Sequence, residues 1–469
     1  MKKLLAIIVL GLLLNTNAQA KHRTFDDPFL YYKKFEVKGS ENHYKFQSSL
    51  REDKDVLKEI KNTKKTGLIS YLLFEDDKIV IDESDIPDKT RKGKNNEAEK
   101  IHNGLLQSHS MGKSLVSYVT GHAICEGYIS SVDEKLTGWD IIENTLFDNQ
   151  VLIDLLNMQA GDQNYVGERI KPHHDGYIKN KKDINGKKIS VNTTPLKILM
   201  KKYFQNTKKS KPVYNYSALT TNVIMNYVIF KTGDDWEKLL HKVFNEHVKV
   251  KDNVYFQQTV PRYMPNSMIP YPTQGSGRYS FYATRYDYLR IAKTIMDDWN
   301  NNTCAGKYLK TIYERRINKN RKESSYEPKS AGSYSRKYGG QFHFDITGLS
   351  KRKILAMDGF GGQQILIDFD TKRIIVVNTM DMHYNWRKIV YKKIKEKKLK
   401  LGKSKEKTKV IKYVATAKNK KDNLFLMKSR KYSSIDDAEN DVLKRCKLFF
   451  EPYGNNMQEA CYIDSVDKE

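Results

Sequence analysis

Two apolar runs in residues 67–84, GLISYLLFEDDKIVIDES, lie on either side of a polar Glu75-Asp76-Asp77-Lys78 stretch. This pattern predicts two strands joined by a tight turn. From residue 353, three more apolar runs, KILAMDGF, QQILIDFD and KRIIVVNTM, are separated by Gly-Gly and Asp-Thr-Lys. They predict three further strands, followed by a basic amphipathic helix, NWRKIVYKKIKE, that ends at about residue 396.

Apolar residues at helical spacing occur between these two groups of strands. A helix is predicted from Ser110, in SMGKSLVSYVTGHAICEGY, and two more in 151–161 and 218–233. The last two segments end in Gly161 and Gly233, which suit helix C-caps. Strands from both ends of the chain, with helices between them, predict an α+β fold whose sheet is assembled from distant segments.

The first 20 residues have the features of a secretory signal peptide. Lys2 and Lys3 precede the apolar run LLAIIVLGLLL, which small residues follow up to Ala18-Gln19-Ala20. The run is too short to span a bilayer. We therefore predict a signal peptide over residues 1–20, cleaved after Ala20, and a periplasmic or secreted mature protein with no transmembrane segment.

Residues 397–409, KKLKLGKSKEKTK, have the composition of a solvated basic linker. We predict that this linker separates a large domain, residues 21–396, from a small α+β module over residues 410–469. The module has the pattern strand, strand, helix, strand. Its core is small for independent folding, so a disulfide would stabilise it.

Four cysteines are present in the chain. Cys446 and Cys461 lie close together in sequence and are the expected disulfide pair. Cys125 lies in an apolar helical run, and we expect it to be a buried small hydrophobe. Neither a CxxC motif nor a Cys/His spacing typical of zinc sites occurs, so no metal or cofactor is predicted.

The formal net charge of +27 suits a partner such as nucleic acid, an anionic membrane or a cell-wall polymer. The charge is spread along the whole chain, and Lys, Asn, Ile and Tyr are abundant throughout. No zinc-finger or RNP signature accompanies it. We therefore favour a lineage bias in composition, predict no nucleic-acid partner, and retain weak contact with anionic envelope polymers as an expectation.

The strongest chemical signal is Ser110-Met111-Gly112-Lys113 at the start of an apolar helix. A serine hydroxyl needs a base within hydrogen-bond reach to act as a nucleophile. Residues three apart share a helix face, so Lys113 can direct its amine at Ser110. The helix N-terminus favours a developing oxyanion. S-x-x-K alone is a weak signal, because an N-capping serine and a surface lysine give the same pattern.

Five segments strengthen that signal by occurring in a fixed order: SMGKS, DLLNMQAG, YNYSALTTNVIMNYV, GSGRYSFYATRYDYLRIA and MDGFGGQQILIDFD. Over roughly residues 60–395 the chain resembles the serine β-lactamase-related superfamily, the penicillin-recognising hydrolases. The resemblance is strongest to the branch of 6-aminohexanoate-dimer hydrolases and their esterase-like relatives. It implies an antiparallel sheet flanked by helices, with a mostly helical subdomain.

The resemblance implies a role for several residues. Ser110 matches the acylated nucleophile, and Lys113 matches its general-base partner. The family's Tyr-x-Asn or Tyr-x-Ser element falls on Tyr216-Ser217-Ala218, so Tyr216 would relay a proton to the leaving group. A rival alignment starts this element at Tyr214. We prefer Tyr216, because the apolar residues that follow then align.

A third family element, Lys-Thr-Gly or His-x-Gly, lies on a strand beside the nucleophile. The literal Lys231-Thr232-Gly233 comes too soon after Tyr216 and suits a helix end. The better match is Met357-Asp358-Gly359, which leads into Phe360-Gly361. The N–H groups of Ser110 and Phe360 would then form the oxyanion hole, with Gly359 and Gly361 lining the substrate site.

Two substitutions depart from the family pattern. Ala218 occupies a substrate-binding position where the family has Asn or Ser, which hydrogen-bonds the substrate amide. Met357 stands where relatives carry a cation for the substrate carboxylate. Both changes favour substrates other than β-lactams and peptidoglycan stems.

Other candidate residues have weaker support in the sequence. His109 precedes the nucleophile and is expected to be a pocket or surface residue, and Asp358 a structural one. His173, His174 and His383 lack a metal-ligand spacing. Tyr165 follows the NMQAGD segment, which lines the pocket in relatives.

We therefore predict an exported serine hydrolase that cleaves an amide or ester bond through an acyl-enzyme. One alternative is a DD-peptidase or β-lactamase on the same fold. The other is a non-catalytic protein that binds the cell envelope through this scaffold.

Overall fold

The computed structural model describes residues 30–85, 104–168, 176–261, 275–319, 331–379, 384–396, 413–419, 422–429, 435–450 and 461–468. The predicted signal peptide, the predicted linker 397–409 and the histidines His173, His174 and His383 lie outside these ranges.

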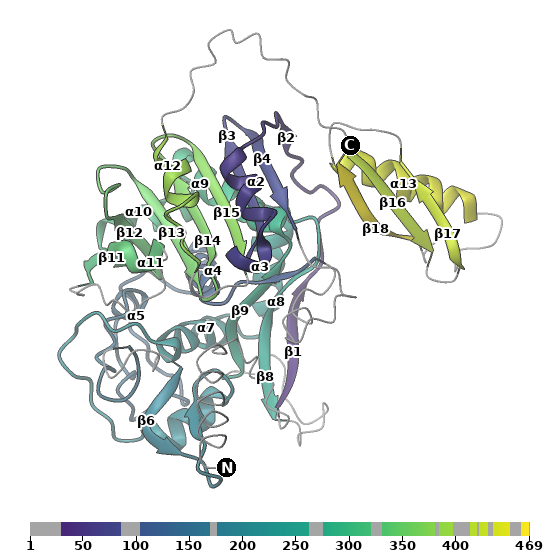
Figure 1. Cartoon of the computed structure of the whole chain (residues 1–469). Coiled ribbons are helices and arrows are strands. Elements are labelled where there is room, and N and C mark those ends of the chain that lie inside the picture. Colours follow the sequence, from purple (N-terminus) through teal and green to yellow (C-terminus); the bar gives the residue numbers. More distant parts are fainter. Residues whose placement is uncertain are drawn as a thin grey trace, which may run out of the picture.

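The centre of the fold is a sheet in the order β10-β11-β12-β13-β14-β15-β3-β4-β2 (Figure 1). Its strands are β2 Gln47–Ser48, β3 Leu68–Glu75, β4 Lys78–Ser84, β10 Ile317–Asn318, β11 Ser335–Gly339, β12 Phe342–Ile346, β13 Ile354–Gly359, β14 Gln363–Asp368 and β15 Arg373–Thr379. All pairs are antiparallel except the short β2–β4 pair. Because β15 pairs with β3, strands from the two ends of the domain meet in one sheet, as predicted.

The predicted β3–β4 turn is confirmed. Asp76 and Asp77 connect the strands with φ values of 52° and 58°. Two consecutive positive φ values are typical of the turn type whose twist matches an antiparallel hairpin, and aspartate tolerates them better than most residues.

Side chains alternate between two apolar layers along the central strands. On β3, Leu72 and Phe74 enter one hydrophobic cluster, while Tyr71 and Leu73 enter another on the opposite face. Helices pack on both faces, so these strands are buried throughout. The helices packed around this sheet are α2 Lys54–Ile60, α3 Thr63–Thr66, α9 Arg285–Asn301, α10 Cys304–Glu314, α11 Ala331–Tyr334 and α12 Val390–Lys395.

A mostly helical region lies between β5 and β8 in the chain. It contains α4 Met111–Cys125, α5 Leu152–Leu156, α6 Leu196–Leu199, η2 Met200–Phe204, α7 Ala218–Thr232, η3 Gly233–Asp235, α8 Trp236–His241 and η4 Lys242–His247. The predicted helices at 110 and 218 are confirmed, and Gly233 caps α7. The prediction that Gly161 caps a helix is wrong, because α5 ends at Leu156. The backbone oxygen of Gly161 instead accepts a hydrogen bond from the Ser210 N–H.

A second sheet, in the order β1-β8-β9-β5, was not predicted from the sequence. Its strands are β1 Leu30–Val37, β5 Leu106–Gln107, β8 Val254–Pro261 and β9 Gly277–Ala283. Strand β9 packs against α4, so this sheet supports the helix that follows Ser110. A small hairpin of β6 Tyr177–Lys182 and β7 Lys188–Ser190 completes the helical region.

The C-terminal segment forms its own three-stranded sheet, in the order β17-β16-β18, with one helix (Figure 1). The elements are β16 Tyr413–Asn419, β17 Asp422–Lys428, α13 Ile435–Phe450 and β18 Cys461–Lys468, in the predicted order. The expected Cys446–Cys461 disulfide links α13 to β18. Asp436 of α13 pairs with Lys251 at 3.2 Å, which joins this segment to the body.

The interpretation of Cys125 is wrong, because it forms a disulfide with Cys304. The two residues are 179 positions apart, and the bond joins the last residue of α4 to the first residue of α10. An apolar helical run gave no sign of this partner, because α10 reaches α4 only through tertiary packing. None of the described helices has the length and apolar character needed to cross a membrane.

Glu134 is held by three donors where α7 meets the loop before α5. Its carboxylate accepts hydrogen bonds from the Ser130 N–H at 2.6 Å and the Tyr227 hydroxyl at 2.7 Å, and pairs with Lys231 at 3.0 Å. Burial alone would raise the pKa of Glu134, but these donors outweigh it and lower the pKa to about 2. Lys231, in the Lys-Thr-Gly sequence that we set aside as a helix end, thus makes a structural ion pair.

This site predicts a loss of stability in acid. The folded-state pKa of Glu134 lies below its ordinary value of 4.5, so the folded protein binds fewer protons than the unfolded chain between pH 4.5 and 2. The contribution of Glu134 to the free energy of unfolding is present above pH 4.5. It falls, by on the order of 2 kcal/mol, as the pH drops from 4.5 to 2. Glu134→Gln should lower the free energy of unfolding at pH 7 and flatten its decline from pH 5 to 2. Urea titrations at several pH values measure the free energy of unfolding of both proteins. An equally steep decline between pH 5 and 2 in the two would refute this prediction.

Candidate active site

Ser110 lies at the N-cap of α4, directly after a strained turn. His109 has a φ of 46°, in the left-handed region that side chains other than glycine seldom adopt. This turn brings Ser110 to the start of the helix, where the N–H groups of Met111 and Gly112 donate to the backbone oxygens of Ser108 and His109. The His109 ring lies 6.0 Å from the Phe360 ring, edge to face, which places His109 beside the β13–β14 turn.

Lys113 connects two hydroxyl groups. Its Nζ donates hydrogen bonds to Ser110 Oγ at 2.9 Å and to the Tyr216 hydroxyl at 3.0 Å. The side chain is 1 % exposed, and Nζ lies 4.1 Å and 4.5 Å from the ring centres of Tyr216 and Tyr279. A buried amine that touches both a serine and a phenol can pass protons between them.

Gly112 explains why this helix can approach its neighbours so closely. A Cβ at Gly112 would lie 1.8 Å from the backbone oxygen of Tyr279 and 2.8 Å from Ser108 Oγ. The absence of a side chain therefore lets α4 pack directly on β9, and this contact brings the Tyr279 ring to Lys113.

We expect Gly112→Ala to lower the free energy of unfolding by about 1–3 kcal/mol or more, because strand backbone has to move to admit the methyl group. Gly176→Ala is a matched control, since its Cβ would meet only a side-chain atom of Asn192 at 3.1 Å. Thermal unfolding followed by circular dichroism measures both. Equal melting temperatures for the two variants would contradict the close packing.

Tyr214 and Tyr216 have different surroundings. Both rings contact Tyr338, at 5.3 Å for Tyr214 and 6.2 Å for Tyr216, and the Tyr216 hydroxyl also accepts a hydrogen bond from Lys113. Between them, buried Asn215 donates to a carboxylate oxygen of Asp162 at 2.6 Å. This geometry favours Tyr216 over the rival alignment.

Asp162 anchors the segment that carries Tyr216, and sequence reasoning did not single it out. Besides Asn215, it accepts a hydrogen bond from Thr220 at 2.9 Å. Burial raises the pKa of Asp162, and its hydrogen bonds oppose that effect. Tyr165, in the same loop, packs against Phe204 at 5.8 Å.

The end of β13 lies against the residues around Ser110. A Cβ at Gly359 would lie 2.4 Å from the backbone oxygen of Ser108 and 3.3 Å from Met111 Cγ. The turn that follows contains Phe360, which is 40 % exposed, and Gly361, which has a φ of 79°. The predicted oxyanion-hole residues therefore belong to two backbone segments that touch.

Solved structures share this arrangement of elements, although no protein-family model and no curated protein matches the sequence. A protein of Bacillus anthracis assigned as a 6-aminohexanoate-dimer hydrolase has a TM-score of 0.50 and 15 % identity, covering 76 % of this chain and 87 % of that one. EstCE1, a hydrolase with promiscuous acyltransferase activity, has a TM-score of 0.46 and 12 % identity, covering 71 % and 95 %. A class C β-lactamase in complex with cefoxitin has a TM-score of 0.43 and 13 % identity, covering 72 % and 98 %.

The chain has the serine β-lactamase-like fold. Two positions that depart from the family pattern are apolar and buried. Ala218 is the first residue of α7 and is fully buried, and Met357 is fully buried in the main hydrophobic cluster. Neither side chain supplies a polar group to a substrate.

A chain of buried polar side chains lies near Tyr216, and the sequence did not predict it. Lys319 Nζ contacts Ser335 Oγ at 3.1 Å, and Ser335 Oγ lies 3.0 Å from His343 Nδ1. The His343 ring is 6.4 Å from the Tyr216 ring. Ser335 is on β11, His343 is on β12, and Lys319 directly follows β10, and no sequence motif marked any of them.

Proposed function

We propose that this chain is an exported serine hydrolase that cleaves an amide or ester bond through an acyl-enzyme on Ser110. The observation that carries the proposal is the position of Lys113 Nζ, 2.9 Å from Ser110 Oγ and 3.0 Å from the Tyr216 hydroxyl. The signal-peptide pattern of residues 1–20 supports export. Residues 21–396 form the catalytic domain in this proposal, with 397–409 as linker and 410–469 as a separate module.

In the acylation step, Ser110 Oγ attacks the substrate carbonyl carbon, and its proton passes to the hydrogen-bonded Lys113–Tyr216 pair. The new C–O bond leaves a negative charge on the carbonyl oxygen. The backbone N–H groups of Ser110 and Phe360 stabilise that oxyanion, and losing one such donor costs about 3–4 kcal/mol of barrier.

Collapse of this intermediate breaks the bond to the amine or alcohol, which takes a proton from Tyr216. Water then attacks the acyl-enzyme and gives its proton to the same group of bases. The acid product leaves as Ser110 regains its proton. One lysine and one phenol thus serve both halves of the reaction.

Ala218 and Met357 support a substrate that differs from β-lactams. A β-lactam offers an amide and a carboxylate, and neither side chain can hydrogen-bond or pair with them. A neutral amide or ester lacks the carboxylate, so the absence of a cation at Met357 carries no cost for it.

The test compares p-nitrophenyl butyrate with a chromogenic cephalosporin on the tag-free mature protein. We expect a burst of p-nitrophenol equal to the enzyme concentration, followed by steady turnover. We expect kcat/KM for the cephalosporin to be lower by roughly 100-fold or more. Efficient cephalosporin turnover would instead support the β-lactamase alternative. No burst and no turnover of either compound would favour the non-catalytic envelope-binding protein.

A further inference from the structure

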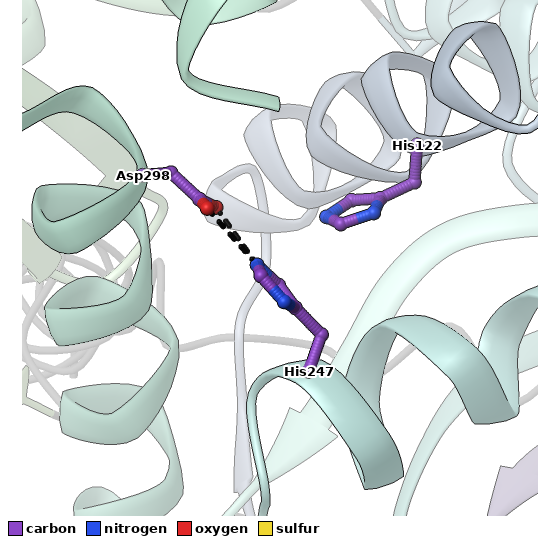
Figure 2. Close-up of side chains that lie close together, drawn as sticks. All are labelled: His122, His247 and Asp298. Atoms are coloured by element: carbon purple, nitrogen blue, oxygen red, sulfur yellow. Dashed lines mark hydrogen bonds and ion pairs between the residues drawn. The ribbon is translucent and has the colours of Figure 1, made fainter. Parts of the chain in front are cut away.

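A cluster of two histidines and one aspartate lies away from Ser110, at the other end of α4. His122 is in the last turn of α4, His247 is the last residue of η4, and Asp298 is on α9. One ligand atom from each residue lies within 4.8 Å of the other two (Figure 2). His122 is twelve positions after Ser110 along the helix, a distance of about 18 Å.

His122 has an unused buried nitrogen. Its side chain is largely buried, with the residue 8 % exposed, and its Nε2 has no hydrogen-bond partner among the described residues. Figure 2 shows the ring pointing toward His247 and Asp298. A buried polar atom without a partner is rare in proteins and calls for a ligand or another explanation.

The three side chains are of the kinds that bind metal ions. Imidazole nitrogens and carboxylate oxygens are common ligands of divalent transition metals. The Asp298 carboxylate is buried, and it lies beside the two imidazoles.

Neighbouring groups fix the orientation of Asp298. The Tyr118 hydroxyl donates to one carboxylate oxygen at 2.6 Å, and Thr303 Oγ1 donates to the other at 2.7 Å. Such outer hydrogen bonds orient ligating carboxylates in metal sites. The Cys125–Cys304 disulfide lies directly beside this group, three residues after His122 and one residue after Thr303.

We propose that His122, His247 and Asp298 bind a divalent transition metal ion, with Zn²⁺ the best match, and that water completes the site. Two imidazoles and a carboxylate are common zinc ligands. His247 Nε2 lies 3.0 Å from Asp298, close to the separation of roughly 3.3 Å between ligand atoms of a tetrahedral zinc ion, and the ligand atom of His122 lies within 4.8 Å of both.

The site is accessible from solvent, because the His247 side chain is 37 % exposed. A bound ion would link α4, η4 and α9, three elements that are distant in sequence. Its role is therefore structural, at the end of α4 opposite the nucleophile. This inference does not depend on the proposed hydrolase activity.

Thermal unfolding of the tag-free mature protein, stripped with EDTA and titrated with ZnCl₂, tests the site. We expect a saturable rise of several degrees in the melting temperature with one ion per chain, because an ion that binds only the folded state stabilises it. His247→Ala should abolish the rise and should fold, because this side chain is partly exposed. His122→Phe, which keeps an aromatic ring but removes both nitrogens, should do the same.

His241→Ala is the matched control, since His241 is an exposed histidine nearby that pairs with Glu246. It should retain the full zinc response. Substituting Co²⁺ should give the visible absorption of a four-coordinate ion in the wild type and not in His247→Ala. No melting shift in the wild type, or a shift that persists in His247→Ala, would overturn the proposal.

Discussion

Ser110→Ala is expected to lower kcat/KM for p-nitrophenyl butyrate by at least about 10⁴-fold, to the level left by binding and the oxyanion hole alone. The substitution removes the only atom that forms the acyl-enzyme in the proposed mechanism. Lys113→Ala should cause a loss of similar size, because the two residues act as one unit. Steady-state kinetics on all variants measures these losses.

Ser117→Ala is the matched control for this loss. Ser117 is also on α4, but its hydroxyl bonds to Tyr308 instead of Lys113. We expect its kcat/KM to stay near that of the wild type. Ester hydrolysis that survives in Ser110→Ala and is lost in Ser117→Ala would mean that the wrong serine has been assigned.

Tyr216→Phe is expected to lower kcat by about 10²–10⁴-fold, the usual size of a general acid–base contribution. The variant keeps the ring near Lys113 Nζ and removes only the hydroxyl that lies 3.0 Å from it. Tyr214→Phe should change kcat by no more than a few-fold, because it keeps the ring that packs against Tyr338 and leaves the Tyr216 hydroxyl on Lys113. Pre-steady-state kinetics would show whether acylation or deacylation slows.

The opposite result, with a large loss in Tyr214→Phe and little in Tyr216→Phe, would restore the rival alignment. Equal and small losses in both variants would leave Lys113 as the sole proton carrier. A pH profile of kcat/KM for Tyr216→Phe separates a catalytic role from a packing role, because only the former changes the profile.

The strands that form continuous apolar runs bounded by turn residues, and the helices with apolar residues at helical spacing, could be predicted from the sequence. The runs at 67–84 and 353–379 became β3, β4, β13, β14 and β15. The Asp76-Asp77 turn and the Gly233 cap were predictable because their chemistry is local. The Ser110–Lys113 contact was predictable for the same reason, since three residues of helix set its distance.

Features that depend on tertiary packing were not predicted from the sequence. Cys125 forms its disulfide with Cys304 only because α10 packs on α4. The second sheet pairs β1 with β8, which lie more than 200 residues apart, and no local pattern encodes that register. Lys319, His343 and the His122–His247–Asp298 cluster are likewise assembled from separate elements, so no short motif reveals them.

Labelling with a fluorophosphonate probe, followed by mass spectrometry of the proteolytic peptide that contains Ser110, tests the proposed nucleophile most directly. The folded wild type should carry one adduct, on Ser110, and Ser110→Ala and heat-denatured wild type should carry none. A folded wild-type protein with no adduct, or with its adduct on another serine, would contradict the proposal that Ser110 is the nucleophile.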